Sequence, residues 1–340
     1  MTRDSLDALV VGGGAFGTAL ASQLSRLGRR TLLWVRRPEQ AEEINQRHTN
    51  QRYLPGCALP EALRATNDLA AAVHGAPLLL VAVPSREFRG VAKLLGDCVE
   101  GDHLLVHVAK GIERGSFKRM SQVLREETCA LKIGVLSGPN LAPELMAGHP
   151  AGAQVASRFR EVVQRTQALF AGGRLRVYGG ADVVGTEVGG AFKNIIALAG
   201  GVADGMGFGD NTKSLLVTRG LGEMARYGVA VGADVFTFGG LAGIGDLMAT
   251  CASALSRNHQ VGERLGRGEA LDAILASMPH VVEGVTTTQA VHPQALAMKL
   301  ALPIVGAVHG MLFEGWSPRD AVERLMALPV GDELFSLRYR

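Results

Sequence analysis

The chain has 340 residues, 47% of them hydrophobic and 20% charged, a composition typical of globular proteins and a length that favours two domains. Its formal net charge of +3, from 35 basic against 32 acidic residues, is too balanced to indicate binding to nucleic acid or to an anionic membrane surface. Any affinity for anions must therefore come from a local site.

The cysteines and histidines point to neither a disulfide scaffold nor a metal. The 4 cysteines are widely spaced without a CxxC pair, and the 9 histidines show no HExxH spacing. Met1–Leu9 has no apolar region of the kind a signal peptide needs, and the apolar run near Pro77–Pro84 is far shorter than the roughly 20 residues of a membrane-spanning helix. We therefore expect a cytoplasmic protein without a bound metal.

The first half of the chain alternates short apolar runs with helical patterns, which is typical of βαβ units and a parallel sheet covered on both faces. The runs expected to form strands are Ala8–Val11, Thr31–Val35, Leu78–Val83, Leu104–Val108 and Ile133–Leu136. Two further extended segments, around Gly152–Ala156 and Leu175–Tyr178, are expected to add to the edge of this sheet.

From Val184 onward the pattern is that of long helices. The expected helices are Glu187–Val202, Asn211–Tyr227, Asp272–Met278, Pro293–Leu300 and Arg319–Leu325. Gly228 is expected to be a left-handed C-cap, and Pro318 the first residue of the last helix. The fold class predicted is α/β: a parallel-sheet domain over residues 1–183, then an all-α domain over residues 184–340.

The clearest motif is Val10–Leu20, in which G-x-G-x-x-G follows a predicted strand and opens a predicted helix. Gly12 allows the tight turn, Gly14 lets the backbone approach a diphosphate, and Gly17 permits close packing of helix on strand. The helix N-terminus adds N–H groups and the positive end of its dipole. These features predict a Rossmann-type domain that binds a dinucleotide, the alternative being a glycine-rich turn without a ligand.

The end of the second predicted strand bears on the choice of dinucleotide. An acidic residue at this place normally binds the ribose 2′-hydroxyl of NAD. Here the strand runs into Arg36 and Arg37, whose guanidinium groups could grip a 2′-phosphate. The sequence therefore favours NADPH, with NADH as the other candidate.

A lysine in an apolar, glycine-rich helical segment is the main catalytic candidate. Lys193 lies within Glu187–Leu198, where burial would lower the pKa of its amine until it can exchange a proton near neutrality. A ketone reductase needs such a group to protonate the developing alkoxide. A lysine that extends from the helix edge into solvent is the structural alternative.

Two further segments carry polar groups suited to a phosphorylated substrate. Asp246 is the acid of the glycine-containing loop Leu241–Thr250. Shortly after it, Ser256 precedes Arg257 and Asn258 near the expected start of a helix, where fork-like donors can hold a phosphate.

Segments spread over nearly the whole chain resemble bacterial-type NAD(P)-dependent glycerol-3-phosphate dehydrogenases. They occur in the family's order, and they are Gly12–Leu20, His48–Asn50, Tyr53–Gly56, Val83–Ser85, Ala109–Glu113, Ser137–Pro139, Glu187–Asn194, Asp204–Asn211, Gly243–Thr250, Leu255–Asn258 and Val281–Val285. The resemblance implies reversible reduction of dihydroxyacetone phosphate to sn-glycerol 3-phosphate, a supply of glycerol phosphate for phospholipid synthesis, and a homodimer.

The resemblance also implies roles for individual residues. Lys193 would be the general acid/base, Lys110 would lie at the substrate beside the nicotinamide, and Asp246 would bind substrate and position Lys193. The other implied substrate contacts are Gly138, Asn140, Thr250, Ser256, Arg257 and Asn258. Beyond the glycine motif and the two arginines, the implied cofactor contacts are Ala15, Phe16, Lys110, Ala142, Arg257, Val281 and Glu283.

One segment departs from the family. After Ser137–Pro139 the family usually has Ser or Thr, then Phe, Ala and Lys, whereas this chain has Asn140–Pro143. Asn140 can still donate and accept hydrogen bonds.

Two other functions stay open. A ketopantoate or β-hydroxyacid dehydrogenase would also use a lysine, but on a carboxylate substrate that leaves Arg257 and Asn258 without a phosphate to hold. A cofactor-binding redox sensor would keep the fold but would not turn over a substrate.

Overall fold

The computed structural model describes residues 6–278 and 282–330. The chain folds as two compact units. The first comprises the chain up to Ala109 together with Met120–Val183, and the second comprises Lys110–Arg119 together with the chain from Val184 onward. The segment Lys110–Arg119, called the arm below, lies before residue 183 in the sequence but belongs to the second unit. The two units are therefore not divided by a single boundary at residue 183.

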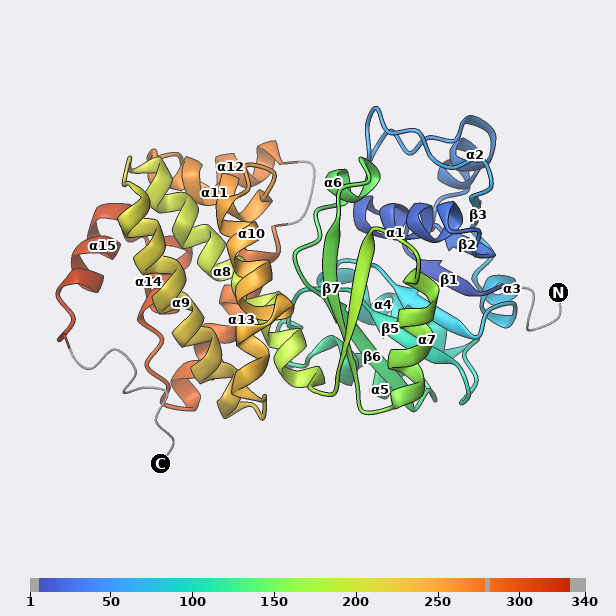
Figure 1. The fold of residues 1–340 in the computed structure, drawn as a ribbon. Helices are drawn as coiled ribbons and strands as arrows, with labels where there is room; N and C mark the ends of the chain where they lie inside the picture. Colours follow the sequence, from blue (N-terminus) through green and yellow to red (C-terminus); the bar gives the residue numbers. More distant parts are fainter. Residues whose placement is uncertain (1–5, 279–281, 331–340) are drawn as a thin grey trace. The chain divides into compact units, whose positions relative to one another are not determined.

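The first unit contains an eight-stranded sheet in the order β3-β2-β1-β4-β5-β6-β7-β8 (Figure 1). Its strands are β1 (Ala8–Val11), β2 (Thr31–Trp34), β3 (Arg64–Thr66), β4 (Leu78–Val81), β5 (Leu104–His107), β6 (Lys132–Ser137), β7 (Ala151–Ser157) and β8 (Leu175–Gly180). The seven predicted strands are all confirmed, and the short β3 is the one that the sequence patterns did not indicate.

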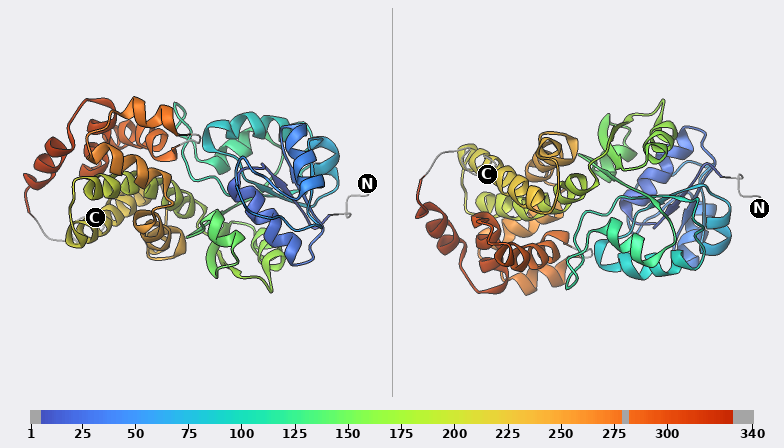
Figure 2. Two further views of the ribbon diagram at one scale, coloured as in Figure 1. Left: turned by 90° about the horizontal axis from the view of Figure 1, so that it is seen from above. Right: turned by 90° about the horizontal axis from the view of Figure 1, so that it is seen from below.

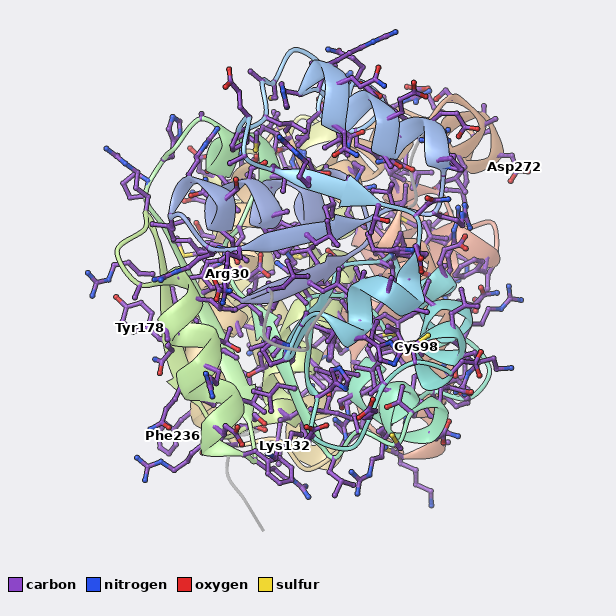
Figure 3. All side chains as sticks on the ribbon, turned by 90° about the vertical axis from the view of Figure 1, so that its right-hand side faces the viewer. Arg30, Cys98, Lys132, Tyr178, Phe236 and Asp272 are labelled. Carbon is purple, nitrogen blue, oxygen red and sulfur yellow. The ribbon has the colours of Figure 1, made fainter. Side chains whose placement is uncertain are left out.

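The sheet is mixed rather than wholly parallel. Neighbouring strands pair in parallel except β6 and β7, which are antiparallel. The connection between these two strands carries only the five-residue helix α6 (Ala142–Met146). The chain therefore turns back at one end of the sheet, without the longer crossover that a parallel pair requires. As predicted, β7 and β8 extend the sheet at its edge, where Tyr178 of β8 is an exposed side chain (Figure 3).

Successive strand residues point to opposite faces of the sheet, and in β1, β4 and β5 the residues on both faces are buried. Helices therefore cover both faces. Ala8 and Val10 pack with α1, α2, α6 and α7, whereas Leu9 and Val11 pack with α3, α4 and α5. Figure 2 shows these two helical layers on either side of the sheet. The helices are α1 (Ala15–Arg26), α2 (Pro38–Arg47), α3 (Leu69–His74), α4 (Ser85–Gly96), α5 (Met120–Glu127), the short α6 and α7 (Arg160–Phe170).

The second unit is helical and packs around α8, which is buried along nearly its whole length (Figure 1). Its elements are α8 (Val183–Gly205), α9 (Asp210–Ala230), the short turns η1 (Val235–Gly239) and η2 (Leu241–Gly245), α10 (Asp246–Ala252), α11 (Arg257–Gly266), α12 (Leu271–Ser277), α13 (Glu283–Ala297), α14 (Pro303–Phe313) and α15 (Pro318–Met326). The predictions for α8, α9, α12 and α15 are confirmed, and Pro318 opens α15 behind a Ser317 capping box.

Two details of the helical predictions are wrong. Gly228 lies inside α9 rather than at its end, and a Cβ there would stand 2.1 Å from the Phe238 ring. The glycine provides room for an aromatic side chain, while the positive φ after α9 occurs at Gly232. Pro293 lies inside α13, which begins at Glu283.

Helix α14 was not expected from the sequence patterns. Its N-terminus is held by the buried Glu223 carboxylate of α9, which accepts from the N–H groups of Ile304 and Val305. A carboxylate far away in the sequence thus takes the place of a local capping residue.

Glycines let α8 and α11 approach each other at backbone distance. A Cβ on Gly201 would lie 2.1 Å from the carbonyl oxygen of His259, and one on Gly262 would lie 2.0 Å from that of Leu198. Gly205 faces α11 at a similar distance. This close crossing places the beginning of α11 on the same central helix that carries Lys193.

Candidate active site

The glycine turn has the geometry that a dinucleotide site requires. Gly12 follows β1 with φ of 119°, and a Cβ there would lie 2.5 Å from the carbonyl oxygen of Ala82. A Cβ on Gly17 would lie 2.0 Å from the carbonyl oxygen of Gly12, so α1 packs directly on the turn. Gly14 is the N-cap of α1, and a Cβ there would meet no other described atom within 4 Å. The approach to the N-terminus of α1 is therefore open, as a bound diphosphate requires.

Two buried amides that sequence reasoning did not single out for a role fix this turn. Gln40 Nε2 donates to the carbonyl oxygen of Gly13 at 2.6 Å, and Asn50 Nδ2 donates to the same oxygen at 3.0 Å. Asn50 Nδ2 also donates to Thr18 Oγ1 at 2.8 Å. Asn50 occurs in a family-like segment, but only the fold shows that it ties the loop after α2 to the glycine turn.

The two arginines stand directly after β2, as expected. Arg36 is 77% exposed, and its guanidinium lies 3.6 Å from the Glu87 carboxylate. Arg37 is half-buried and is the N-cap of α2. Because the Arg36 side chain is long, exposed and only loosely paired, it can turn toward a phosphate.

The loop after β6 holds three further predicted residues of the first unit. Gly138 has φ of 145°, and a Cβ there would lie 2.9 Å from the carbonyl oxygen of Gly152, which explains the glycine. Asn140 Nδ2 donates to the carbonyl oxygens of Pro139 and Gly152 at 2.9 and 2.8 Å. Its Oδ1 is buried and accepts no hydrogen bond from the described residues, which leaves an acceptor for a ligand. Ala142 begins α6 and is buried.

The predicted catalytic lysine is buried and ion-paired. Lys193 is 6% exposed, and its amine donates to Asp246 Oδ1 and, at 2.7 Å, to Thr250 Oγ1. Asp246 is 2% exposed, and its other oxygen, Oδ2, accepts from the Lys110 amine at 2.7 Å. One carboxylate thus bridges two ammonium groups. Because Asp246 and Thr250 lie four residues apart on α10, both present oxygens to the same amine.

The electrostatics of this cluster suit proton transfer. Burial lowers the pKa of Lys193 from 10.5 to about 8, with the Asp246 charge opposing the shift and the Lys110 charge adding to it. The neighbouring Cys251 thiol has its pKa raised to about 12 by burial, so it stays neutral and takes no part as a nucleophile. Lys193, rather than the Cys251 thiol, is therefore suited to exchange a proton near neutral pH.

The arm explains how Lys110 reaches this cluster. In the sequence it follows β5, but it folds with the second unit. Its carbonyl oxygen accepts from Asn194 Nδ2 at 3.2 Å. Asn194 belongs to a family-like segment without an assigned role, and its position directly after Lys193 is the one signal that could have singled it out.

The beginning of α11 carries the predicted phosphate-binding triplet. Ser256 is the N-cap, with its Oγ accepting from the backbone N–H of His259, and Arg257 is the exposed first helical residue. Asn258 is buried: its Nδ2 donates to Asn194 Oδ1 at 2.9 Å, and its Oδ1 accepts from the Gly284 N–H at 2.8 Å. Asn258 therefore joins α8, α11 and α13.

The remaining predicted residues have different outcomes. Ala15 and Phe16 lie partly buried at the start of α1, and Glu283 is the first residue of α13. Val281 lies outside the described residues. Within residues 6–278 and 282–330, no helix combines the length and apolarity needed to cross a bilayer, and no cluster of three potential metal ligands occurs.

Models of one protein family match both units of the chain. The model of the NAD-dependent glycerol-3-phosphate dehydrogenase N-terminus matches residues 8–163, and that of the C-terminus matches residues 182–323. The chain belongs to this family. The glycerol-3-phosphate dehydrogenase [NAD(P)+] of Geobacillus thermodenitrificans is 46% identical over 94% of both chains, and that of Streptomyces griseus is 47% identical over 94% of this chain and 96% of that one.

Solved structures agree with the family assignment. The glycerol-3-phosphate dehydrogenase of Coxiella burnetii has a TM-score of 0.90 and 34% identity, covering 94% of this chain and 98% of that one. A ketopantoate reductase from Ralstonia eutropha has a TM-score of 0.57 at 14% identity, with coverage of 94% and 99%. That second similarity is one of fold alone.

Proposed function

We propose that this protein catalyses the reversible NAD(P)H-dependent reduction of dihydroxyacetone phosphate to sn-glycerol 3-phosphate. The observation that carries the proposal is the contact of the buried pair Lys193 and Asp246 with the partly buried Lys110, because it places a proton donor of lowered pKa beside a second cation. Family membership supplies the substrate class.

Lys193 is the group that would move the proton. When bound, the nicotinamide supplies the hydride that reaches the carbonyl carbon of the ketone. The carbonyl oxygen then gathers negative charge and takes a proton from the Lys193 amine; in the oxidation of glycerol phosphate the amine takes it back. Asp246 and Thr250 accept two of the three ammonium protons, which leaves the third for the substrate oxygen.

The other polar groups would orient and neutralise the substrate. Lys110 adds positive charge where the oxyanion develops, and Asp246 prevents the two ammonium groups from repelling each other. Arg257 at the N-terminus of α11 is placed to hold the phosphate, supported by the helix dipole. Asn258 uses one N–H of its amide on Asn194, so the second N–H can donate to the phosphate.

The glycine turn supports cofactor binding in the first unit. Gly12, Gly14 and Gly17 leave the N-terminus of α1 open to a diphosphate, and the orphan Oδ1 of Asn140 can accept from a ligand hydroxyl or amide. We propose residues 1–183 as the cofactor-binding region and residues 184–340, with the arm, as the catalytic region. A cytoplasmic homodimer that supplies phospholipid synthesis is part of the same proposal.

The test of function is a spectrophotometric assay with three substrates. NADPH oxidation is followed with dihydroxyacetone phosphate, ketopantoate and a semialdehyde under identical conditions. We expect turnover with dihydroxyacetone phosphate at least roughly 100-fold above the others, because the carboxylate substrates cannot use the phosphate-binding start of α11. Faster reduction of ketopantoate would refute the assignment, and tight cofactor binding without any turnover would favour a sensor.

We also propose a preference for NADPH, supported by Arg36 and Arg37 at the end of β2. Arg36→Ala is expected to lower kcat/KM with NADPH by roughly 10-fold and to change the value with NADH little, because a bidentate guanidinium–phosphate contact is lost. Arg30→Ala, at the opposite end of the same strand, is the matched control, since Arg30 pairs with Asp7. An unchanged NADPH-to-NADH ratio in Arg36→Ala would remove this residue from cofactor selection.

A further inference from the structure

The arm that carries Lys110 is a folded loop with an anchor in the second unit. Ile112 is buried in the core of that unit, with Phe117 packed against the same core. Ile112 forms an antiparallel bridge with Arg119, and the N–H of Glu113 donates to the carbonyl oxygen of Lys118 at 2.9 Å. The two ends of the arm are therefore joined, and a displacement of one end moves the other.

Helix α8 holds both of these ends. At the leading end, Asn194 Nδ2 donates to the carbonyl oxygen of Lys110. At the returning end, the Arg119 guanidinium donates to the Glu187 carboxylate. Glu187 and Asn194 are seven residues apart, about two helical turns or roughly 10 Å, so they lie on the same face of α8. The arm thus lies along one face of the helix that bears Lys193.

The pair of Arg119 and Glu187 is unlike the surface ion pairs of this protein. The Glu187 side chain is 5% exposed and that of Arg119 is 19% exposed. In the surface pair of Arg319 and Glu323 the corresponding values are 84% and 65%. Exposed pairs contribute little, whereas loss of one partner of a buried pair leaves an uncompensated charge. Removal of Arg119 is therefore expected to disturb the arm more than removal of Arg319 disturbs its surroundings.

We propose that the Arg119–Glu187 ion pair is a positioning device for Lys110: it holds the returning end of the arm on α8 and so keeps the Lys110 amine on Asp246, next to Lys193. The inference deepens the proposed function and rests on the roles given there to Lys110 and Lys193. Neither Arg119 nor Glu187 touches the substrate in this scheme, and both act through Lys110.

A positioning role has a consequence that a purely structural role lacks. The charged groups that face the Lys193 amine are Asp246 and Lys110, while Thr250 is uncharged and the Cys251 thiol is neutral. The Lys110 charge lowers the pKa of Lys193, so an arm that has moved away lets this pKa rise. Because ketone reduction uses the protonated amine, the loss of activity at alkaline pH would then move to higher pH, by roughly 0.5–1 unit for a close pair of like charges.

The experiment uses the full chain with Arg119→Ala and Glu187→Gln. The pH dependence of kcat for dihydroxyacetone phosphate reduction gives the kinetic pKa, and the pH dependence of amine labelling at Lys193, read by peptide mass spectrometry, gives the same pKa without activity. We expect both values to rise by about 0.5–1 unit and kcat/KM to fall roughly 10-fold. Arg119→Lys should show a smaller rise of the pKa than Arg119→Ala, since it keeps a cation opposite Glu187, and Arg319→Ala should show none.

A double-mutant cycle with Lys110→Ala decides whether the pair acts through Lys110. In the Lys110→Ala background, Arg119→Ala should cause no further change in the labelling pKa of Lys193. A further shift of equal size in that background would overturn the proposal, as would a lower melting temperature in Arg119→Ala with an unchanged pKa. Failure of the proposed function would be recognised by different results: the parent would not reduce dihydroxyacetone phosphate, or Lys193→Ala would keep full turnover.

Discussion

Lys193→Ala is expected to lower kcat for dihydroxyacetone phosphate reduction by roughly 10²–10⁴-fold, the usual contribution of a positioned general acid. The reason is the environment of its amine: it is buried, bonded to Asp246 and Thr250, and its pKa is lowered to about 8. The other amine of the cluster, that of Lys110, is not expected to replace it, because it is held on the opposite oxygen of the Asp246 carboxylate.

The variant should keep its fold. Asp246 retains Lys110 as an ionic partner, and alanine favours a helical position. Steady-state kinetics and far-UV circular dichroism measure the two effects separately. Lys213→Ala is the control, since this half-exposed lysine on α9 pairs with Asp204 and Asp210. Turnover near that of the parent in Lys193→Ala would exclude Lys193 from the mechanism.

Gly201→Ala is expected to lower the free energy of unfolding by about 3 kcal/mol, the upper end of the usual cost of overpacking a core. The added Cβ would lie 2.1 Å from the carbonyl oxygen of His259 and 2.8 Å from the backbone nitrogen of Glu263. Both are backbone atoms of α11, so relief requires the helix itself to move. Such a movement shifts Arg257 and Asn258, and KM for the phosphorylated substrate should rise as well.

The adjacent glycine provides a matched control. A Cβ on Gly200 would meet only the Cys251 side chain, at 3.9 Å, which is an ordinary contact. Gly200→Ala should therefore stabilise the protein by about 0.5–1 kcal/mol through its higher helix propensity. Urea unfolding of the two variants measures the difference. Equal stabilities would show that α8 and α11 do not depend on this close approach.

Local patterns are sufficient for much of the first unit. The apolar runs that begin at Ala8 and Leu104 are strands because residues buried on both faces must be apolar throughout, and each run shows that without reference to the rest of the chain. The turn Gly12–Gly17 is predictable from its motif: a Cβ on Gly17 would clash with the carbonyl oxygen of Gly12, while Gly14 leaves the helix N-terminus open.

Other features depend on partners that are distant in sequence. Glycine favours a helix end, yet Gly228 lies within α9 opposite Phe238. Proline favours the beginning of a helix, but α13 passes through Pro293. At Gly228, packing against Phe238 thus outweighs a local preference of about 1 kcal/mol.

The amino-acid sequence by itself determined the class of the fold, the dinucleotide motif and the candidacy of Lys193, because each of these follows from residue type and short-range spacing. Only the tertiary structure decided that Lys110 folds with the helical unit, that Asp246 bridges it to Lys193, and that glycines bring α11 onto α8. The hydrogen bond between Lys110 and Asp246 joins residues 136 positions apart, and such contacts depend on where the whole chain places them, so no local pattern carries that information.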